Sequence, residues 1–431
     1  MPFPLRRSVA LLSLSMLGAS AQAAEAAETT ASWRLFVTDH AGPTITALDL
    51  DQPENTWTFE LDGPSRVYAP PSGETIVAVQ MDHDSVAFID SGIEMNRHDD
   101  HGEITVQDPT LIEATLSGDR PFHVVFHDGV MATNFDRGGY VEMVDLGSLR
   151  NGEVATERFD QNRPHHGFGA PIGDAIVSSV ASAETMEEDK LPPRIGLAAY
   201  ERDGTLIGQV ATCTDLHGEA FSGQYLATGC REGVLLVSQA DGAPEFRMLP
   251  YPEDFPDEKT GKLLGVKAEQ RFLGNHGDKA VVVIDPEQPP YFQRVELPFR
   301  PLDFVLDPAR PEFAYLLTED GTLHRFNLRS TEVEQSVSVT QPYSMDGHWT
   351  DPRPRLAVAG DHVVVTDPLE GLVKVVDGDA LTMTNQIELA GMPYNIVAVG
   401  TAGVTLGQDA VDAAAAAPAD DGVRIREQAA Q

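Results

Sequence analysis

The stretch Arg120-Pro-Phe-His123-Val-Val has a pattern that the chain repeats. Arg300-Pro-Leu-Asp303-Phe-Val and Gly391-Met-Pro-Tyr-Asn395-Ile-Val share its order: a proline, a large apolar residue, one polar residue and an apolar run. Pro164-His-His166-Gly and Asp215-Leu-His217-Gly lie between them, with histidine in the polar position. The polar positions are therefore spaced at multiples of roughly 45 residues, the period of a propeller blade. Positions that are distant in the chain but share one role in such a repeat indicate a closed ring.

A second repeated phrase is an apolar run that ends in aspartate or a close substitute. It occurs at 45–49, 86–90, 141–145, 196–201, 234–238, 281–285, 323–327 and 373–377. Helical periodicity is scarce, and short apolar runs are separated by Gly, Pro and Asp, so the chain is predicted to be all-β. The phrases predict a single β-propeller of eight four-stranded blades, or of seven if one repeat has been divided in two.

The two ends of the predicted ring share one blade. Tyr394–Gly400 has the character of an innermost strand with no strand after it. Trp33–Asp39, Ile45–Leu48 and Thr56–Leu61 are three strands that lack an innermost partner. The propeller is therefore expected to span residues 33–405, followed by an Ala-rich tail at 406–431 that is disordered or loosely helical.

The N-terminus has the features of a secretory signal. Arg6 and Arg7 precede the apolar segment Val9–Leu17, and Ala21-Gln-Ala23 is a small-x-small cleavage site. Residues 1–23 are thus predicted to be removed on export to the periplasm, with 24–32 as a linker. No later segment approaches the ~20 apolar residues of a membrane span, so membrane insertion is not expected. The formal charge of −37 excludes a general affinity for nucleic acid or anionic membranes.

Export permits disulfides, and the chain has two cysteines, Cys213 and Cys230. They flank Gly218–Gly223 and Tyr225–Gly229, which are expected to form two antiparallel strands. The cysteines would then meet at one end of the pair. The sequence favours a disulfide just before His217 over two buried free thiols.

The repeated histidines are the main candidate for chemistry. Residues at one register of successive inner strands face the central channel, so His123, His166 and His217 are expected to cluster there. Three neutral imidazoles suit tetrahedral zinc, with a fourth ligand completing the shell. Asp303 lies in the same register across the channel, and Asp346 or His348 could also supply that ligand. The alternative is that the histidines line a wet channel and bond to backbone.

A second candidate lies between Gly92 and Gly118, predicted to be a mobile polar loop. It contains His98-Asp-Asp-His101-Gly-Glu103. Two histidines three residues apart, with carboxylates between them, can take zinc but supply few fixed ligands. A solvated loop without metal is the alternative.

Several phrases make the sequence resemble one known family. They are Phe36-Val-Thr-Asp-His40, Phe88-Ile-Asp-Ser-Gly-Ile93, the loop His98–Glu103, Leu216-His-Gly-Glu-Ala220, Leu297-Pro-Phe-Arg300 and Tyr343-Ser-Met-Asp-Gly-His-Trp349. The chain is similar, over about residues 33–400, to the AztD-type periplasmic zinc metallochaperones. This resemblance implies a propeller that binds zinc in its channel and at a histidine-bearing loop. It also implies direct transfer of zinc to the solute-binding protein of a zinc ABC importer.

Two other functions remain open. A channel metal with an open coordination position could activate water in a secreted hydrolase or lyase, with Asp303 or Glu219 as general base. Neither a catalytic Cys/His spacing nor a Gly-x-Ser-x-Gly elbow is present. A metal-free scaffold for protein interactions is the third possibility. The sequence favours the zinc chaperone, which is not an enzyme.

Overall fold

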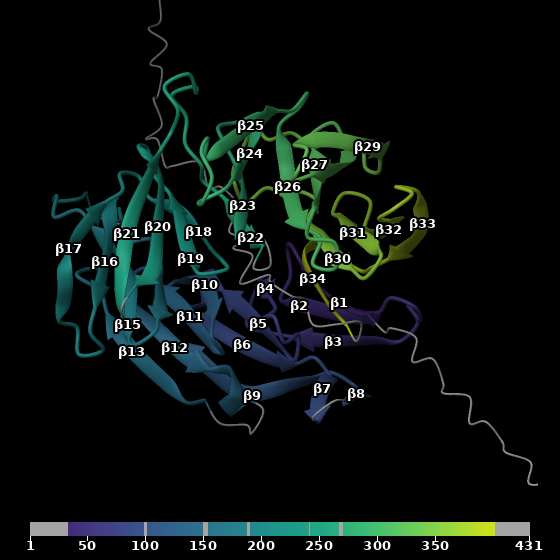
Figure 1. Cartoon of the computed structure of the whole chain (residues 1–431). Coiled ribbons are helices and arrows are strands. Elements are labelled where there is room, and N and C mark those ends of the chain that lie inside the picture. Colours follow the sequence, from purple (N-terminus) through teal and green to yellow (C-terminus); the bar gives the residue numbers. More distant parts are fainter. Residues whose placement is uncertain are drawn as a thin grey trace, which may run out of the picture. The chain divides into compact units, whose positions relative to one another are not determined.

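Eight four-stranded antiparallel sheets follow one another along the chain in the computed structural model (Figure 1). The structure describes residues 33–98, 101–149, 154–187, 190–240, 242–266 and 270–400. The predicted signal peptide, linker and C-terminal tail lie outside these residues. The prediction of a β-propeller is confirmed, and the number of blades is eight.

Each blade runs from an innermost strand to an outermost one. The innermost strands are β4 (Arg66–Tyr68), β10 (Pro121–His127), β14 (Gly169–Ile172), β18 (His217–Ser222), β22 (Leu263–Val266), β26 (Pro301–Leu306), β30 (Leu356–Ala359) and β34 (Pro393–Gly400). The second strands are β5 (Thr75–Gln80), β11 (Val130–Phe135), β15 (Ala175–Ala181), β19 (Tyr225–Gly229), β23 (Arg271–Asn275), β27 (Phe313–Thr318), β31 (His362–Asp367) and β1 (Trp33–Asp39).

The two outer positions complete the blades. The third strands are β6 (Ser85–Asp90), β12 (Tyr140–Asp145), β16 (Arg194–Tyr200), β20 (Gly233–Ala240), β24 (Ala280–Ile284), β28 (Thr322–Asn327), β32 (Leu372–Asp377) and β2 (Thr44–Asp49). The fourth strands are β9 (Thr110–Ser117), β13 (Thr156–Asp160), β17 (Leu206–Thr212), β21 (Ala243–Pro250), β25 (Phe292–Glu296), β29 (Glu332–Ser338), β33 (Met383–Glu388) and β3 (Thr56–Glu60). The eight repeated apolar phrases all fall on third strands, as the repeat predicts.

Closure of the ring rests on backbone pairing between the two ends of the described chain. β34 pairs antiparallel with β1, from Trp33 opposite Gly400 to Asp39 opposite Pro393. This sheet has the order β3-β2-β1-β34, so its innermost strand comes from the other end of the chain. The predicted shared blade is confirmed.

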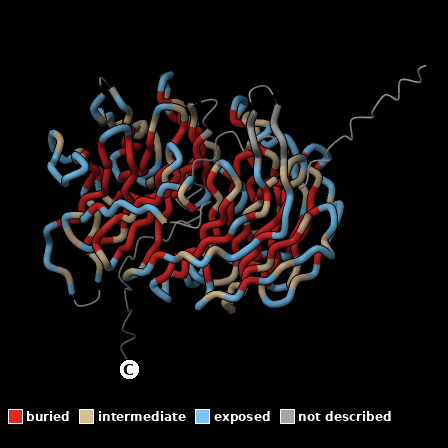
Figure 2. Tube along the Cα trace, turned by 90° about the horizontal axis from the view of Figure 1, so that it is seen from below, coloured by how far each residue is buried: buried red, intermediate tan, exposed pale blue. Residues whose placement is uncertain are grey.

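Apolar side chains fill every junction between neighbouring blades. Buried clusters join each pair of neighbouring blades, such as Phe36 and Ile45 of the closing blade with Ile76 of the next, and one cluster extends over the three blades that begin with β10, β14 and β18. Inner and middle strands are buried, whereas the residues of the outer strands are mostly exposed or half-buried (Figure 2). Burial of one Leu, Val or Phe side chain contributes about 1.5–3 kcal/mol, so each blade stabilises both of its neighbours.

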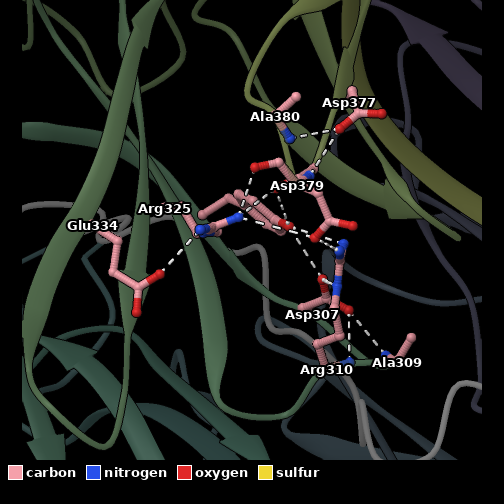
Figure 3. A network of polar contacts seen from close by, with 10 residues as sticks. Asp307, Ala309, Arg310, Arg325, Glu334, Asp377, Asp379 and Ala380 are labelled. Atoms are coloured by element: carbon pink, nitrogen blue, oxygen red, sulfur yellow. Dashed lines mark hydrogen bonds and ion pairs between the residues drawn. The ribbon is translucent and has the colours of Figure 1, made fainter.

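Polar contacts supplement this packing between the blades that contain β28 and β32 (Figure 3). Arg325 donates a hydrogen bond to the carbonyl of Asp379 and pairs with Glu334 on its own blade. Arg310 joins the buried carboxylate of Asp307 to the side chain of Asp379. The two arginines thereby tie the turn after β32 to the neighbouring blade.

The segment predicted to be a mobile loop, Gly92–Gly118, is instead mostly strand. β7 (Ile93–His98) and β8 (His101–Val106) form a two-stranded sheet, and β9 is the outer strand of the blade. Buried Arg34 donates hydrogen bonds to the carbonyls of Ser91 and Gln107, on both sides of the hairpin. The prediction of a mobile loop was wrong, because it relied on the many polar residues of this segment and not on its alternating strand pattern.

Helical structure is minimal in the described residues. It consists of α1 (Leu146–Leu149) and the 3₁₀ turn η1 (Met81–His83). Neither is long and apolar enough to cross a membrane.

Candidate metal site

His123, His166 and His217 come from three consecutive blades. His123 lies in β10, His166 precedes β14, and His217 begins β18. The pairing register shifts between Pro121 and Val124, and again between His217 and Glu219. Such irregularities re-aim a side chain away from the regular alternation of a strand.

The three imidazoles lie close together. Their ring centroids are separated by 4.6 Å (His123 to His166), 6.0 Å (His123 to His217) and 5.7 Å (His166 to His217). One ligand atom from each lies within 4.8 Å of the other two. Tetrahedral zinc with histidine ligands needs nitrogens about 3.4 Å apart. Small side-chain rotations therefore suffice to bring the three nitrogens around one ion.

Each Nδ1 atom already has an acceptor. That of His123 lies 2.9 Å from Oε1 of Glu219, and that of His166 lies 2.8 Å from Oδ2 of Asp136. His217 donates from Nδ1 to the carbonyl of Gly261 at 2.7 Å. This network places the ring protons on Nδ1 and leaves each Nε2 with a lone pair.

The Nε2 atoms of His123 and His166 face each other at 3.1 Å. With both ring protons on Nδ1, neither Nε2 can donate to the other. Two facing lone pairs repel unless a cation lies between them. The arrangement therefore favours a proton or a metal ion at this point.

Burial shapes the electrostatics of the site. It lowers the pKa of His217 well below the ordinary value, and the nearby Arg194 guanidinium adds to this effect. His217 is therefore a neutral ligand well into the acidic range. Burial also raises the pKa of Asp136 to about 6, against the opposing effects of His123 and the Asn134 hydrogen bond. The site is most open beside His166, whose side chain is 19% exposed, compared with 2% for His123.

The structure does not bring the other sequence candidates to this cluster. Asp303 pairs with Lys262 at 2.6 Å and accepts the backbone N–H of Leu356 at 2.9 Å. Exposed His348 is bonded to Thr350, and exposed Asp346 pairs with Arg300. Among the described residues, possible ligands group only at the three histidines.

His98 and His101 are opposite each other at the tip of the β7–β8 hairpin. Their side chains, and Asp99 and Asp100 between them, lie outside the described residues. Zinc binding at this tip stays a prediction.

The predicted disulfide between Cys213 and Cys230 is present. Cys213 lies in the turn before β18 and Cys230 follows β19, so the bond joins the start of one strand to the end of its partner. The backbone that carries His217 is thereby braced.

Sequence reasoning missed two groups that orient the imidazoles, Asp136 and the Gly261 carbonyl. Glu219 was considered only as a possible general base. Asp136 follows β11 in the blade before that of His166, and no repeat places it there. One signal could have pointed to Asp136, namely an aspartate that directly follows the second strand of a blade. Nothing in the sequence marks a carbonyl such as that of Gly261.

Comparison with known proteins supports the architecture. No protein-family model matches the sequence. The zinc chaperone AztD of Citrobacter koseri is 37% identical over 397 residues, which cover 92% of this chain and 93% of that protein. The chain belongs to the AztD family.

Solved structures of this family agree with the fold. The crystal structure of Citrobacter koseri AztD matches with a TM-score of 0.83 at 37% identity, covering 86% of this chain and 99% of that one. The apo form of the same AztD gives 0.81 at 36% identity over the same shares. The dihydro-heme d1 dehydrogenase NirN, at 12% identity and a TM-score of 0.56, covers 84% of this chain and 74% of its own and shares the fold alone.

Proposed function

We propose that this protein is a periplasmic zinc chaperone that holds its cargo at His123, His166 and His217. The observation that carries the proposal is the shared orientation of the imidazoles. All three Nδ1 atoms are held by acceptors, and the Nε2 atoms of His123 and His166 face each other at 3.1 Å. The membership in the AztD family, which includes a zinc chaperone, supports the same function.

Three neutral ligands suit a cargo that must leave again. They leave a fourth position on tetrahedral zinc for water or for a ligand of the receiving protein. The exposed edge beside His166 is the direction from which that ligand would approach. We infer that transfer proceeds by exchange of histidine ligands, one at a time.

The receiving protein in this proposal is the periplasmic solute-binding protein of a zinc ABC importer. The chain carries a formal charge of −37, so a partner with a basic patch would associate fastest at low salt. Transfer should therefore slow as ionic strength rises. The tip residues His98 and His101 are proposed as a second, weaker binding point.

The hydrogen bonds of the carboxylates nearest to the three histidines favour a binding role over hydrolysis. Glu219 and Asp136 each contact an imidazole nitrogen. Both carboxylates thus orient ligands in this arrangement. Asp303, the other suggested base, is bonded to Lys262.

The direct test compares zinc stoichiometry and affinity of the purified protein with those of a His123→Ala/His166→Ala/His217→Ala variant. We expect loss of the tight site in a variant that still folds, with an unfolding temperature lowered by the unpaired carboxylates of Glu219 and Asp136. The matched control is His83→Ala/His362→Ala, which changes histidines outside the cluster and should bind zinc normally. Tight zinc binding that survives the triple substitution would contradict the proposed site, and a His98→Ala/His101→Ala variant would then be measured.

Transfer needs its own measurement. Zinc-loaded protein is mixed with a zinc-free solute-binding protein of a zinc importer, and both are separated and analysed for metal. We expect zinc to move even when a chelator that captures free zinc is present. Transfer abolished by that chelator would exclude direct hand-over.

A further inference from the structure

A cavity of about 250 Å³ lies beside the histidine cluster. Phe122 forms part of its wall, and the ring centroid of Phe122 is 4.6 Å from that of His166. Trp349 and Tyr394 also line the cavity, as do the adjacent residues Ser65 and Arg66 at the start of β4. The cavity and the candidate metal site thus share one wall but are separate spaces.

Arg66 has an arrangement typical of an anion site. Its guanidinium lies over the rings of Phe122 and Trp349, 5.3 and 5.2 Å from their centroids. Stacking on rings satisfies the faces of a guanidinium but leaves its N–H donors unused. Among the described residues, the side chain of Arg66 makes neither an ion pair nor a hydrogen bond.

Ser65 adds a second unused donor. Its hydroxyl is buried, and no hydrogen-bond partner for it exists in the described part of the chain. Buried polar groups without a partner are rare, and a ligand is one common explanation for them. Two neighbouring residues therefore present unsatisfied donors at the same cavity.

The local charge is opposite to that of the protein as a whole. The phenol of Tyr394 is buried, which by itself would raise its pKa. Arg355, Arg66 and Arg353 outweigh that effect, and the pKa of Tyr394 is lowered. Positive charge therefore gathers around Tyr394 at this wall of the cavity, in a chain whose formal charge is −37.

Two carboxylates also line the cavity, but neither neutralises Arg66. Oδ1 of Asp39 accepts the backbone N–H groups of Ala41 and Met392, both at 3.1 Å. Asp82 is exposed to solvent. These charges disfavour a multiply charged anion and limit the ligand to a single carboxylate.

We propose that this cavity binds a carboxylate group through the guanidinium of Arg66 and the hydroxyl of Ser65. A guanidinium edge matches the two oxygens of a carboxylate with parallel hydrogen bonds. The carboxylate belongs either to a small organic acid or to an acidic side chain of another protein. The site is independent of the histidine cluster, so it does not rest on the proposed function.

The test uses metal-free protein, so that chelation of zinc by the acids plays no part. Acetate, propionate and L-glutamate are titrated by calorimetry and by the fluorescence of Trp349, with chloride keeping the ionic strength constant. A peptide with blocked ends and several glutamates is titrated in parallel with its glutamine analogue. A Trp349→Phe variant shows which part of the fluorescence change comes from the cavity.

We expect saturable binding at one site, weakened about tenfold or more by Arg66→Gln and less strongly by Ser65→Ala. The matched control is Arg158→Gln, which removes another arginine stacked on a ring, that of Tyr140 in a different blade. Unfolding temperatures of all variants establish that they fold. Binding of the free acids identifies a small-molecule site, and binding of the peptide alone identifies a protein side chain. If neither probe binds, or if Arg66→Gln binds as the unaltered protein does, the proposal is overturned.

Discussion

Asp136 and His166 come from neighbouring blades, and Oδ2 of the carboxylate lies 2.8 Å from Nδ1 of the imidazole. Asp136 is fully buried and also accepts a hydrogen bond from Asn134. The orientation of one proposed zinc ligand therefore depends on the docking of two blades. Changes to this carboxylate should therefore affect zinc binding.

Removal of this carboxylate should weaken zinc binding without removing a ligand. Groups that orient metal-bound histidines typically account for 10–100-fold in affinity, so we expect about this loss in Asp136→Ala. Competition with a chelator of known affinity measures it. Asp307→Ala is the control. Asp307 is also buried, but it is distant from Asp136 in the chain and pairs with Arg310. An unchanged zinc affinity in Asp136→Ala would mean that the bond to His166 is dispensable.

The ionised carboxylate of Asp136 should reduce the stability of the metal-free protein near neutral pH. Burial raises the pKa of Asp136 from 3.8 to about 6, so between these values the folded protein keeps a proton that the unfolded chain loses. The contribution of Asp136 to the free energy of unfolding therefore falls as pH rises through this window. We expect metal-free Asp136→Asn to be more stable than the unaltered protein at pH 7.5, by roughly 1–3 kcal/mol, and not at pH 4.

Urea unfolding at both pH values measures the difference. The comparison of the two proteins cancels the titration of all other groups. A stability difference that is the same at pH 4 and pH 7.5 would show that the buried charge is not its cause.

Loss of Asp303 should damage the fold and spare zinc binding. Its carboxylate pairs with buried Lys262 and also accepts the backbone N–H of Leu356, so it connects three consecutive blades. Removal of one partner from a buried ion pair costs about 3–5 kcal/mol, because the other charge stays buried. We expect Asp303→Ala to lower the free energy of unfolding by about this amount and to keep its zinc stoichiometry.

The double variant Lys262→Met/Asp303→Leu should recover most of this loss, since it buries no lone charge. Thermal unfolding and metal analysis of both variants provide the readout. Loss of zinc in Asp303→Ala while the protein is still folded would return Asp303 to the set of ligands.

The disulfide should stabilise the blade that carries His217. Cys213 and Cys230 are 17 residues apart, and a loop of this length corresponds to about 3 kcal/mol. We expect Cys213→Ser/Cys230→Ser to unfold at a lower temperature, and the unaltered protein to shift likewise in reductant. If reductant also lowers the unfolding temperature of the double variant, the effect does not come from this bond.

Much of the fold could be predicted from the sequence because its signals recur. A phrase such as Val373–Asp377 is ambiguous by itself, but eight copies of it, about one blade length apart, favoured eight blades over seven. The β7–β8 hairpin occurs once, and its charged residues outweighed the alternation of Ile93, Met95, Ile104 and Val106. A feature without a repeat has only its local composition to indicate it.

The candidate site was predictable in part for the same reason. The repeat register pointed to His123, His166 and His217, and the structure brings their imidazoles together near the starts of three successive blades. The same register also selected Asp303, but Lys262 of the preceding blade pairs with its carboxylate. Glu219 reaches His123 across 96 residues, and such a bond depends on how the blades pack.

The pairing of β34 with β1 has a consequence for biosynthesis. The first blade to be made cannot be completed until the last strand has been made, because that strand is its innermost member. Until then, β1 presents an unpaired edge, and the inner faces of the first and last blades lack their neighbours. A chain that ends before residue 393 therefore leaves the ring open, with an exposed strand edge and exposed apolar surface. Protein quality control can distinguish such a chain from the closed ring. The ring can therefore close only after β34 has been synthesised.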